Sequence, residues 1–203
     1  GIGTIEFAVW DAIAKIEEKP AFRSIEARYN PGGAKPKMFV YVGGGWYAPG
    51  KGTQELLAEM RSYLDVGYTQ LKMKIGGASV AEDMSRLEAV LKLVDDDGWN
   101  LAVDANCGLT REAAFEYAEA MTPFNLRWYE EATDPLDYGL LAELAEAYKA
   151  PLATGENLFS TQDVQNLVRF GGMRADHDVL QTDPPQSYGV VAVTRTIKML
   201  KEH

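Results

Sequence analysis

From Met38 onward the chain alternates short apolar segments with amphipathic ones, and this rhythm strongly limits the folds it can adopt. The apolar segments have the length and composition of β-strands and lie near residues 38–43, 70–75, 100–105, 126–131, 151–156 and 178–183. Between them, apolar residues recur at three- and four-residue steps, which predicts helices near 53–65, 80–96, 111–122, 138–149, 161–170 and 190–202. Six successive strand–helix units predict parallel strands with helical crossovers.

Two architectures build parallel strands in this way, the doubly wound open sheet and the (β/α)8 barrel. The first strand–helix turn, VGGGWYAPGKG, lacks a G-x-G-x-x-G run leading directly into a helix, which gives nucleotide binding little weight. Before the first strand, TIEFAVWDAIAKIEEK carries apolar residues at helical spacing and predicts a helix. Capping pairs predict helix starts at Ser79 with Glu82, at Ser160 with Asp163, and at Asp134 before a proline.

Composition narrows the class of function. The 203 residues are 46% hydrophobic and 25% charged, which is ordinary for a globular domain. A net charge of −10 argues against nucleic acid or an anionic membrane as the main partner. The single cysteine, Cys107, rules out an intrachain disulfide and fits a reducing compartment, so we expect a cytoplasmic protein. No apolar run reaches transmembrane length, and no signal peptide is visible.

Ionisable residues stand at the carboxyl ends of five consecutive predicted strands. The spacing is 26 residues from Asp104 to Glu130 and 26 from Glu130 to Glu156. It is 27 from Glu156 to Asp183 and 30 from Lys74 to Asp104. In a parallel barrel such residues converge at one mouth, where the active site of this architecture lies.

Three of these acids predict a metal site. Carboxylates gathered at one mouth repel each other unless a cation neutralises them, and oxygen ligands suit Mg²⁺. The expected ligands are Asp104, Glu130 and Glu156. Strand alternation favours Glu130 over Glu131, because Glu130 shares a face with Trp128. The alternative is that each acid caps a helix or is a solvated loop charge.

The segment QLKMKIGG places two ammonium groups one pleat apart on the same strand face. One interpretation is an exposed edge strand whose lysines discourage aggregation. Because the neighbouring strands end in acids, we favour a second one, in which both lysines point into the mouth. A nearby cation lowers the proton affinity of an amine, so Lys74 becomes the expected base. Lys72 would assist it and bind a substrate carboxylate. Trp46 and Tyr47, after the first strand, either close over the site or pack within their loop.

Four motifs, LKMKIGG, LAVDAN, WYEE and ATGEN, together resemble the mandelate-racemase-like branch of the enolase superfamily. Three longer runs, WYEEATDPLDYGLLAELAE, ATGENLFSTQDVQNLVRFGGMRADHDVLQTD and SYG, are similar more narrowly to the D-tartrate dehydratases. The resemblance covers essentially all 203 residues. It implies an incomplete (β/α)8 barrel over residues 38–203, a linker at 31–37, and the last helix of an N-terminal capping domain within 1–30.

The resemblance also implies a mechanism. The base, here Lys74, removes the proton next to a metal-bound carboxylate, and Mg²⁺ on Asp104, Glu130 and Glu156 stabilises the ene-diolate. The β-hydroxyl then leaves with help from a general acid, so D-tartrate would give oxaloacetate. Asn106, on the same strand face as Asp104 by alternation, would contact substrate or a metal-bound water.

One part of the family pattern is missing from these residues. In the family, the counterpart of Asp183 orients a histidine that acts as the acid, but the sequence holds only His177, which precedes its strand, and His203, the last residue. Strands seven and eight are also absent. We expect the chain to be a portion of a longer one; a truncated gene or a partner chain that supplies the rest are the alternatives.

The predicted function is therefore Mg²⁺-dependent dehydration of a hydroxy acid or sugar acid, with D-tartrate favoured and a homo-oligomer expected from the resemblance. One alternative is another acid-sugar dehydratase or a racemase with the same metal ligands and base. The other is an inactive metal-binding fragment that lacks the general acid.

Overall fold

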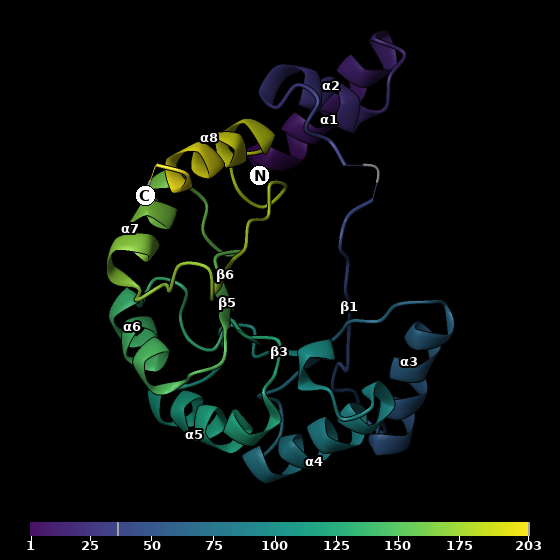
Figure 1. Cartoon of the computed structure of the whole chain (residues 1–203), viewed down its shortest axis with the longest axis vertical. Coiled ribbons are helices and arrows are strands. Elements are labelled where there is room, and N and C mark those ends of the chain that lie inside the picture. Colours follow the sequence, from purple (N-terminus) through teal and green to yellow (C-terminus); the bar gives the residue numbers. More distant parts are fainter. Residues whose placement is uncertain (36, 203) are drawn as a thin grey trace. The chain divides into compact units, whose positions relative to one another are not determined.

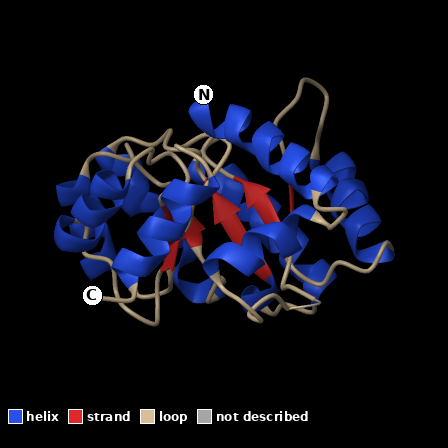
Figure 2. Cartoon of the chain, turned by 90° about the horizontal axis from the view of Figure 1, so that it is seen from above, coloured by secondary structure: helices blue, strands red, loops and turns tan. Residues whose placement is uncertain are grey.

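A computed structural model describes residues 1–35 and 37–202 of the chain. Within these residues, parallel strands form one six-stranded sheet in the order β1-β2-β3-β4-β5-β6. The strands are drawn in red among the surrounding helices in Figure 2. The strands are β1 Val42–Gly44, β2 Leu71–Lys74, β3 Leu101–Asp104, β4 Tyr129–Glu130, β5 Leu152–Thr154 and β6 Val179–Leu180. Each lies inside its predicted segment or overlaps it, and all six predicted strands are confirmed.

The helices that follow the first four strands run one after another along the same side of the sheet (Figure 1). They are α3 Thr53–Asp65, α4 Val80–Leu91, α5 Arg111–Met121 and α6 Tyr138–Ala147. A doubly wound sheet reverses its strand order and carries helices on both faces. The sequential order and one-sided helices are those of a (β/α)8 barrel, so the prediction of an incomplete barrel is confirmed.

The chain divides into two compact units. The sheet unit, Val40–Thr154 and Leu167–Leu180, contains all the strands named above. The terminal unit consists of Gly1–Phe39, Gly155–Asn166 and the residues from Gln181 onward. It contains α1 Ile2–Ile16, α2 Ala21–Tyr29 and α8 Val190–Leu200, while α7 Thr161–Phe170 belongs to both units. The division of the sequence at residues 30 and 38 stays a prediction, and Pro36 of the expected linker lies outside the described residues.

The sheet is buried on both faces. Leu71, Met73, Leu101 and Val103 are fully buried on one face, as expected for parallel strands covered by crossover helices. On the other face Ala102, Trp128 and Ala153 form a cluster against which Tyr41 and Val179 pack. The alternation of strand side chains places Lys72, Lys74, Asp104 and Glu130 on this second face.

Helix starts were predicted well where a cap is local. Ser79 Oγ accepts a hydrogen bond from Glu82 N, and Ser160 and Asp163 bond reciprocally, with Asp163 N to Ser160 Oγ at 3.1 Å and Ser160 N to Asp163 Oδ2 at 3.0 Å. The predicted cap at Asp134 is wrong. Its side chain accepts from Leu136 N within a turn, and Asp137 caps α6 instead, accepting from Leu140 N.

The N-terminal segment differs from its prediction in two ways. Helix α2 was not predicted; it is only nine residues long and begins directly after Pro20. The apolar face expected on α1 is exposed at Ile5, Val9 and Ile16. Across the described part of the chain, no helix is both long and apolar enough to cross a membrane.

Asp178 ties the start of β6 to that of β5, and its removal is expected to destabilise the sheet unit. Its carboxylate accepts from Leu152 N at 2.8 Å and pairs with Arg174 at 2.6 Å. Burial alone would raise the pKa of Asp178, but the hydrogen bonds from Arg174 and Leu152 outweigh it and lower the pKa. We expect Asp178→Asn to lower the free energy of unfolding by about 2 kcal/mol at pH 7.

The sign of the pH dependence follows from that lowered pKa. The stabilisation is complete above the unfolded carboxyl pKa of about 4 and disappears as the pH falls through the folded pKa. Urea unfolding of wild type and Asp178→Asn between pH 7 and pH 3 should therefore give curves that converge at low pH. The exposed neighbour Asp176 supplies the matched control, Asp176→Asn. A stability difference that stays constant over this range would contradict the role of the charge.

Candidate functional site

The two lysines of β2 are buried rather than displayed at an edge. β2 pairs with β1 on one side and β3 on the other, and the exposed fractions of Lys72 and Lys74 are 8% and 9%. The exposed-edge interpretation is therefore wrong. Buried ammonium groups require partners, because desolvation of an unpaired charge is costly. Their partners are acids on the next two strands.

Three site residues lie in one row across the sheet. Lys74 is in register with Asp104, and Asp104 with Glu130. Lys74 Nζ lies 2.5 Å from Asp104 Oδ2, and Lys72 Nζ lies 2.8 Å from the same oxygen. Lys72 also pairs with Glu130 Oε1, while the indole of Trp128 donates to Glu130 Oε2 at 2.7 Å. The structure thus brings together four of the predicted site residues.

The electrostatics of the row differ between its two acids, because Asp104 disfavours the charge of Glu130 while the lysines favour the charge of Asp104. Both acids have no exposed surface. Burial and the nearby Asp104 raise the pKa of Glu130 to about 7, against a smaller opposing effect of Lys72. Burial also acts to raise the pKa of Asp104, but hydrogen bonds from Lys72 and Lys74 lower it overall. The same two acids raise the pKa of Lys72 despite its burial.

This donor set fits a hard divalent cation. Asp104 and Glu130 offer adjacent carboxylate oxygens at the carboxyl ends of neighbouring strands, and burial together with the nearby Asp104 raises the pKa of Glu130, so a bound cation would favour its charged form. The third predicted ligand, Glu156, follows β5 by two residues and belongs to the terminal unit. Among residues 1–35 and 37–202, no three His, Cys, Asp or Glu side chains lie close enough together to hold a metal. The three-ligand set stays a prediction.

The other predicted site residues are placed by loops. Asn106 lies beyond the end of β3 with a left-handed backbone, φ 47°, and an exposed side chain, so strand alternation does not fix its direction. Its backbone N–H donates to Asp104 Oδ1 at 2.9 Å. Asp183 Oδ1 accepts from Gln186 N, and the Gln186 side chain donates to the Glu156 carbonyl. Roles for Asn106 and Asp183 toward a substrate stay predictions.

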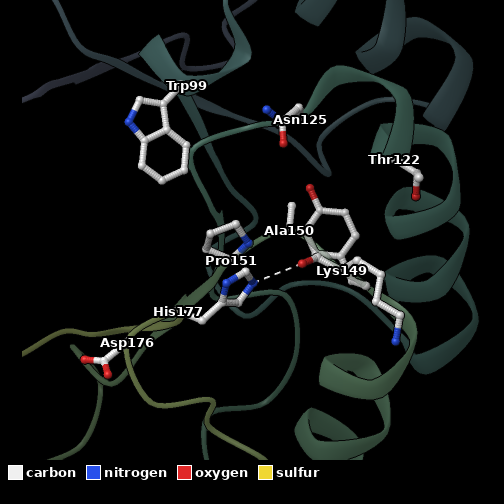
Figure 3. A pocket seen from close by; sticks show the side chains of 9 residues that line it. Trp99, Thr122, Asn125, Lys149, Ala150, Pro151, Asp176 and His177 are labelled. Carbon is white, nitrogen blue, oxygen red and sulfur yellow. Dashed lines mark hydrogen bonds between the residues drawn. The ribbon is translucent and has the colours of Figure 1, made fainter.

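Of the two histidines of the sequence, the structure describes His177, and it is not placed as the acid. His177 lies before β6, at the opposite end of the strands from Asp104, as expected. There it lines a cavity of about 300 Å³ with Trp99 and Pro151, and its Nε2 lies 2.9 Å from the Lys149 carbonyl oxygen (Figure 3). His203 lies outside the described residues.

Sequence reasoning missed a further buried acid, next to Glu130 in the chain. Glu131 has an exposed fraction of 1% and accepts hydrogen bonds from Thr154 Oγ1, at 2.8 Å, and from the Cys107 thiol. Cys107 and Glu131 both have left-handed backbones, with φ of 58° and 48°. Such backbone strain in non-glycine residues is often stored at functional sites. Glu131 follows the end of β4, and its hydrogen bonds from Cys107 and Thr154 connect the loops after β3 and β4 with β5.

A buried network behind β2 was also missed. Asp83 of α4 has no exposed surface and accepts from Tyr47 Oη and Tyr117 Oη, both at 2.6 Å, and from Gly76 N at 2.7 Å. Arg86 pairs with Asp83 at 2.6 Å and donates to the Gly45 carbonyl at 2.8 Å. In sequence, Asp83 looks like an ordinary acid in the first turn of a helix, so nothing local signals this role.

Comparison with known proteins identifies the class. The profile of the family described as Enolase C-terminal domain-like matches residues 55–203. The chain therefore belongs to this family, in the mandelate-racemase-like branch of the enolase superfamily.

Several relatives are acid-sugar dehydratases. The chain is 32% identical to an arabinonate dehydratase of Saccharolobus solfataricus, over 99% of this chain and 51% of that protein. It is 30% identical to the L-talarate/galactarate dehydratase of Salmonella typhimurium, over 100% of this chain and 48% of that protein. An L-talarate dehydratase from Polaromonas sp. JS666, solved with Mg and L-glucarate, superposes with a TM-score of 0.81 at 27% identity, covering 99% of this chain and 53% of that one. The chain spans about half the length of these relatives.

Proposed function

We propose that this chain contributes the base and metal ligands of a Mg²⁺-dependent hydroxy-acid dehydratase. The observation that carries the proposal is the row of Lys74, Asp104 and Glu130 across β2, β3 and β4, with Lys72 beside it. In a member of the enolase C-terminal family, this row combines amines with buried oxygen ligands at the strand ends. Such an arrangement suits removal of a proton next to a carboxylate.

Each residue has a distinct task in this proposal. Lys74 Nζ accepts the α-proton, and Lys72 holds a carboxylate of the substrate. Asp104, Glu130 and Glu156 hold Mg²⁺, which when bound supplies the positive charge that acidifies the carbon next to a carboxylate. Loss of the β-hydroxyl takes up a further proton from an acid. We propose that this acid is a histidine outside these residues, oriented by Asp183.

For the substrate we propose D-tartrate, which would give oxaloacetate and water. Support comes from the three longer sequence runs named above and from relatives that act on sugar acids of similar chemistry. Arabinonate and galactarate are the most informative competitors. We also keep as proposals a homo-oligomeric, cytoplasmic protein and a capping-domain origin for residues 1–30.

The test is proton exchange and product formation in one sample. The purified protein is incubated with MgCl₂ and D-tartrate in D₂O, with loss of the α-proton followed by NMR and oxaloacetate measured by its reduction with malate dehydrogenase and NADH. Oxaloacetate formation supports the proposal. Faster turnover of arabinonate or galactarate would keep the reaction and correct the substrate.

Two other results would change the class of function. Exchange or inversion without oxaloacetate would indicate a racemase or a fragment that lacks the acid, and the intact mass separates these because a bare fragment has 22.4 kDa. A folded sample that shows neither exchange nor Mg²⁺ binding would refute the proposed site.

A further inference from the structure

The indole of Trp46 lies over the amine of Lys74. The distance from Lys74 Nζ to the ring centroid is 4.5 Å, which is within the range of a cation–π contact. Asp104 Oδ2 contacts the same nitrogen at 2.5 Å, so the amine has both an aromatic and a carboxylate neighbour. Trp46 itself is 58% exposed, although it contacts a lysine that is only 9% exposed. A large aromatic side chain is thus left partly in water at the position where it contacts the proposed base.

The loop that carries Trp46 is fixed on both sides of that residue. Gly45 has φ 72°, and its carbonyl accepts from Arg86 at 2.8 Å. The Tyr47 hydroxyl donates to buried Asp83 at 2.6 Å, and the guanidinium of Arg86 lies 4.1 Å from the Tyr47 ring centroid. The residues flanking Trp46 are therefore anchored although its indole is exposed.

The same network holds the backbone of Lys74. Arg86 Nη1 donates to the Lys74 carbonyl at 3.3 Å, and Gly76 N donates to Asp83 at 2.7 Å. One buried ion pair, Asp83–Arg86, thus fixes the end of β2 and the loop after β1 relative to each other. This shared anchor makes the Trp46–Lys74 contact a defined feature of the sheet unit.

We propose that Trp46 is a positioning residue for the proposed base. Its indole face holds the Lys74 amine between the ring and Asp104 and limits the approach of water to that nitrogen. The inference rests on the proposed function of Lys74. Because a displacement of about 1 Å of a reacting group can cost about 10²-fold in rate, a contact that fixes the amine acts on kcat more than on KM.

The experiment compares Trp46→Ala and Trp46→Phe in the full protein, with Trp99→Ala as the matched control. Trp99 is also half-exposed in the sheet unit, but it lies at the opposite ends of the strands. We expect Trp46→Ala to lower kcat for α-proton exchange by about 10- to 100-fold with a smaller change in KM. Trp46→Phe should recover most of the rate because it keeps an aromatic face. Trp99→Ala should match wild type.

A second readout does not depend on turnover. Reductive methylation of Lys74 by formaldehyde and borohydride, followed by peptide mass spectrometry, measures how accessible the amine is. We expect Trp46→Ala to speed methylation at Lys74 at least about threefold, without a comparable change at exposed Lys92. Circular dichroism establishes that each variant is folded.

The outcomes separate the two proposals. If wild type exchanges the α-proton while Trp46→Ala keeps its kcat and its methylation rate, the positioning role is refuted and the proposed function stands. If wild type shows no exchange, the proposed function fails, and the methylation rate alone decides whether Trp46 covers the amine. A loss of rate in Trp46→Ala that Trp46→Phe does not reduce would also overturn the aromatic contact as the cause.

Discussion

Replacing Lys74 by methionine is expected to slow α-proton exchange by about 10²- to 10⁴-fold, the usual contribution of a positioned general base. The fold should survive, because Asp104 keeps its contact with Lys72 at 2.8 Å. Exchange is measured by NMR in D₂O at saturating substrate. Exposed Lys92 supplies the control variant, Lys92→Met, which should exchange at the wild-type rate.

Lys74→Arg separates the base from the charge. Arginine can keep an ion pair with Asp104, but it does not release its proton near neutral pH. We therefore expect Lys74→Arg to lose exchange as methionine does, while its thermal midpoint stays closer to wild type. If Lys74→Arg retains the wild-type exchange rate, Lys74 contributes only its positive charge and does not accept the proton. The base must then be sought elsewhere, first at Lys72.

The row of site residues could be predicted because it follows from the regular repeat of strand–helix units. Spacings of 30 and 26 residues along the chain place Lys74, Asp104 and Glu130 at the ends of neighbouring parallel strands, and register then aligns them. The direct lysine–acid contacts could not be predicted in the same way. They depend on how deeply the strand ends are buried, which reflects packing around Trp128 and Tyr41 rather than any local pattern.

The Asp83 network, in contrast to the row of site residues, could not be predicted from the sequence. Its members come from the loop after β1, the loop after β2 and two helices, and the hydrogen bonds of Asp83 reach residues 36 and 34 positions away. A single sequence gives no signal for such pairs. Tyr47 reads as a loop residue and Tyr117 as part of an apolar helix face. The network matters because it fixes where Lys74 and Trp46 lie.

Burial also limits what strand alternation can say. In the sequence, alternation favoured Glu130 over Glu131 as a site residue, because Glu130 shares a face with Trp128. Glu131 is nevertheless buried, and Cys107 in the loop after β3 and Thr154 of β5 donate hydrogen bonds to it. The α1 helix shows the converse, since its apolar stripe at Ile5 and Val9 is exposed. Periodicity predicts which side chains share a face of a helix or strand, but tertiary packing determines whether that face is buried or exposed.

The two adjacent acids at the end of β4 provide the sharpest test of the metal site. We expect 10 mM MgCl₂ to stabilise wild type by about 1.4 kcal/mol if the ion binds with a Kd of about 1 mM, and by more if it binds more tightly, which raises the melting temperature by roughly 4 °C or more. Glu130→Gln should abolish this shift because it removes a charged ligand. Glu131→Gln, its matched control, should keep it. The measurement is a set of thermal melts with and without MgCl₂.

The metal-free proteins test the same assignment from the other side. Since burial and Asp104 raise the pKa of Glu130 to about 7, its charge is disfavoured in the absence of a cation. Glu130→Gln should therefore be about as stable as wild type without MgCl₂, whereas Asp104→Asn should lose about 3–5 kcal/mol by leaving two buried lysines short of a partner. If Glu131→Gln loses the MgCl₂ shift and Glu130→Gln keeps it, the ligand is Glu131. If both variants keep the shift, Mg²⁺ binds away from this row. The ion could then not acidify a substrate held beside Lys74, and the proposed metal site would be wrong.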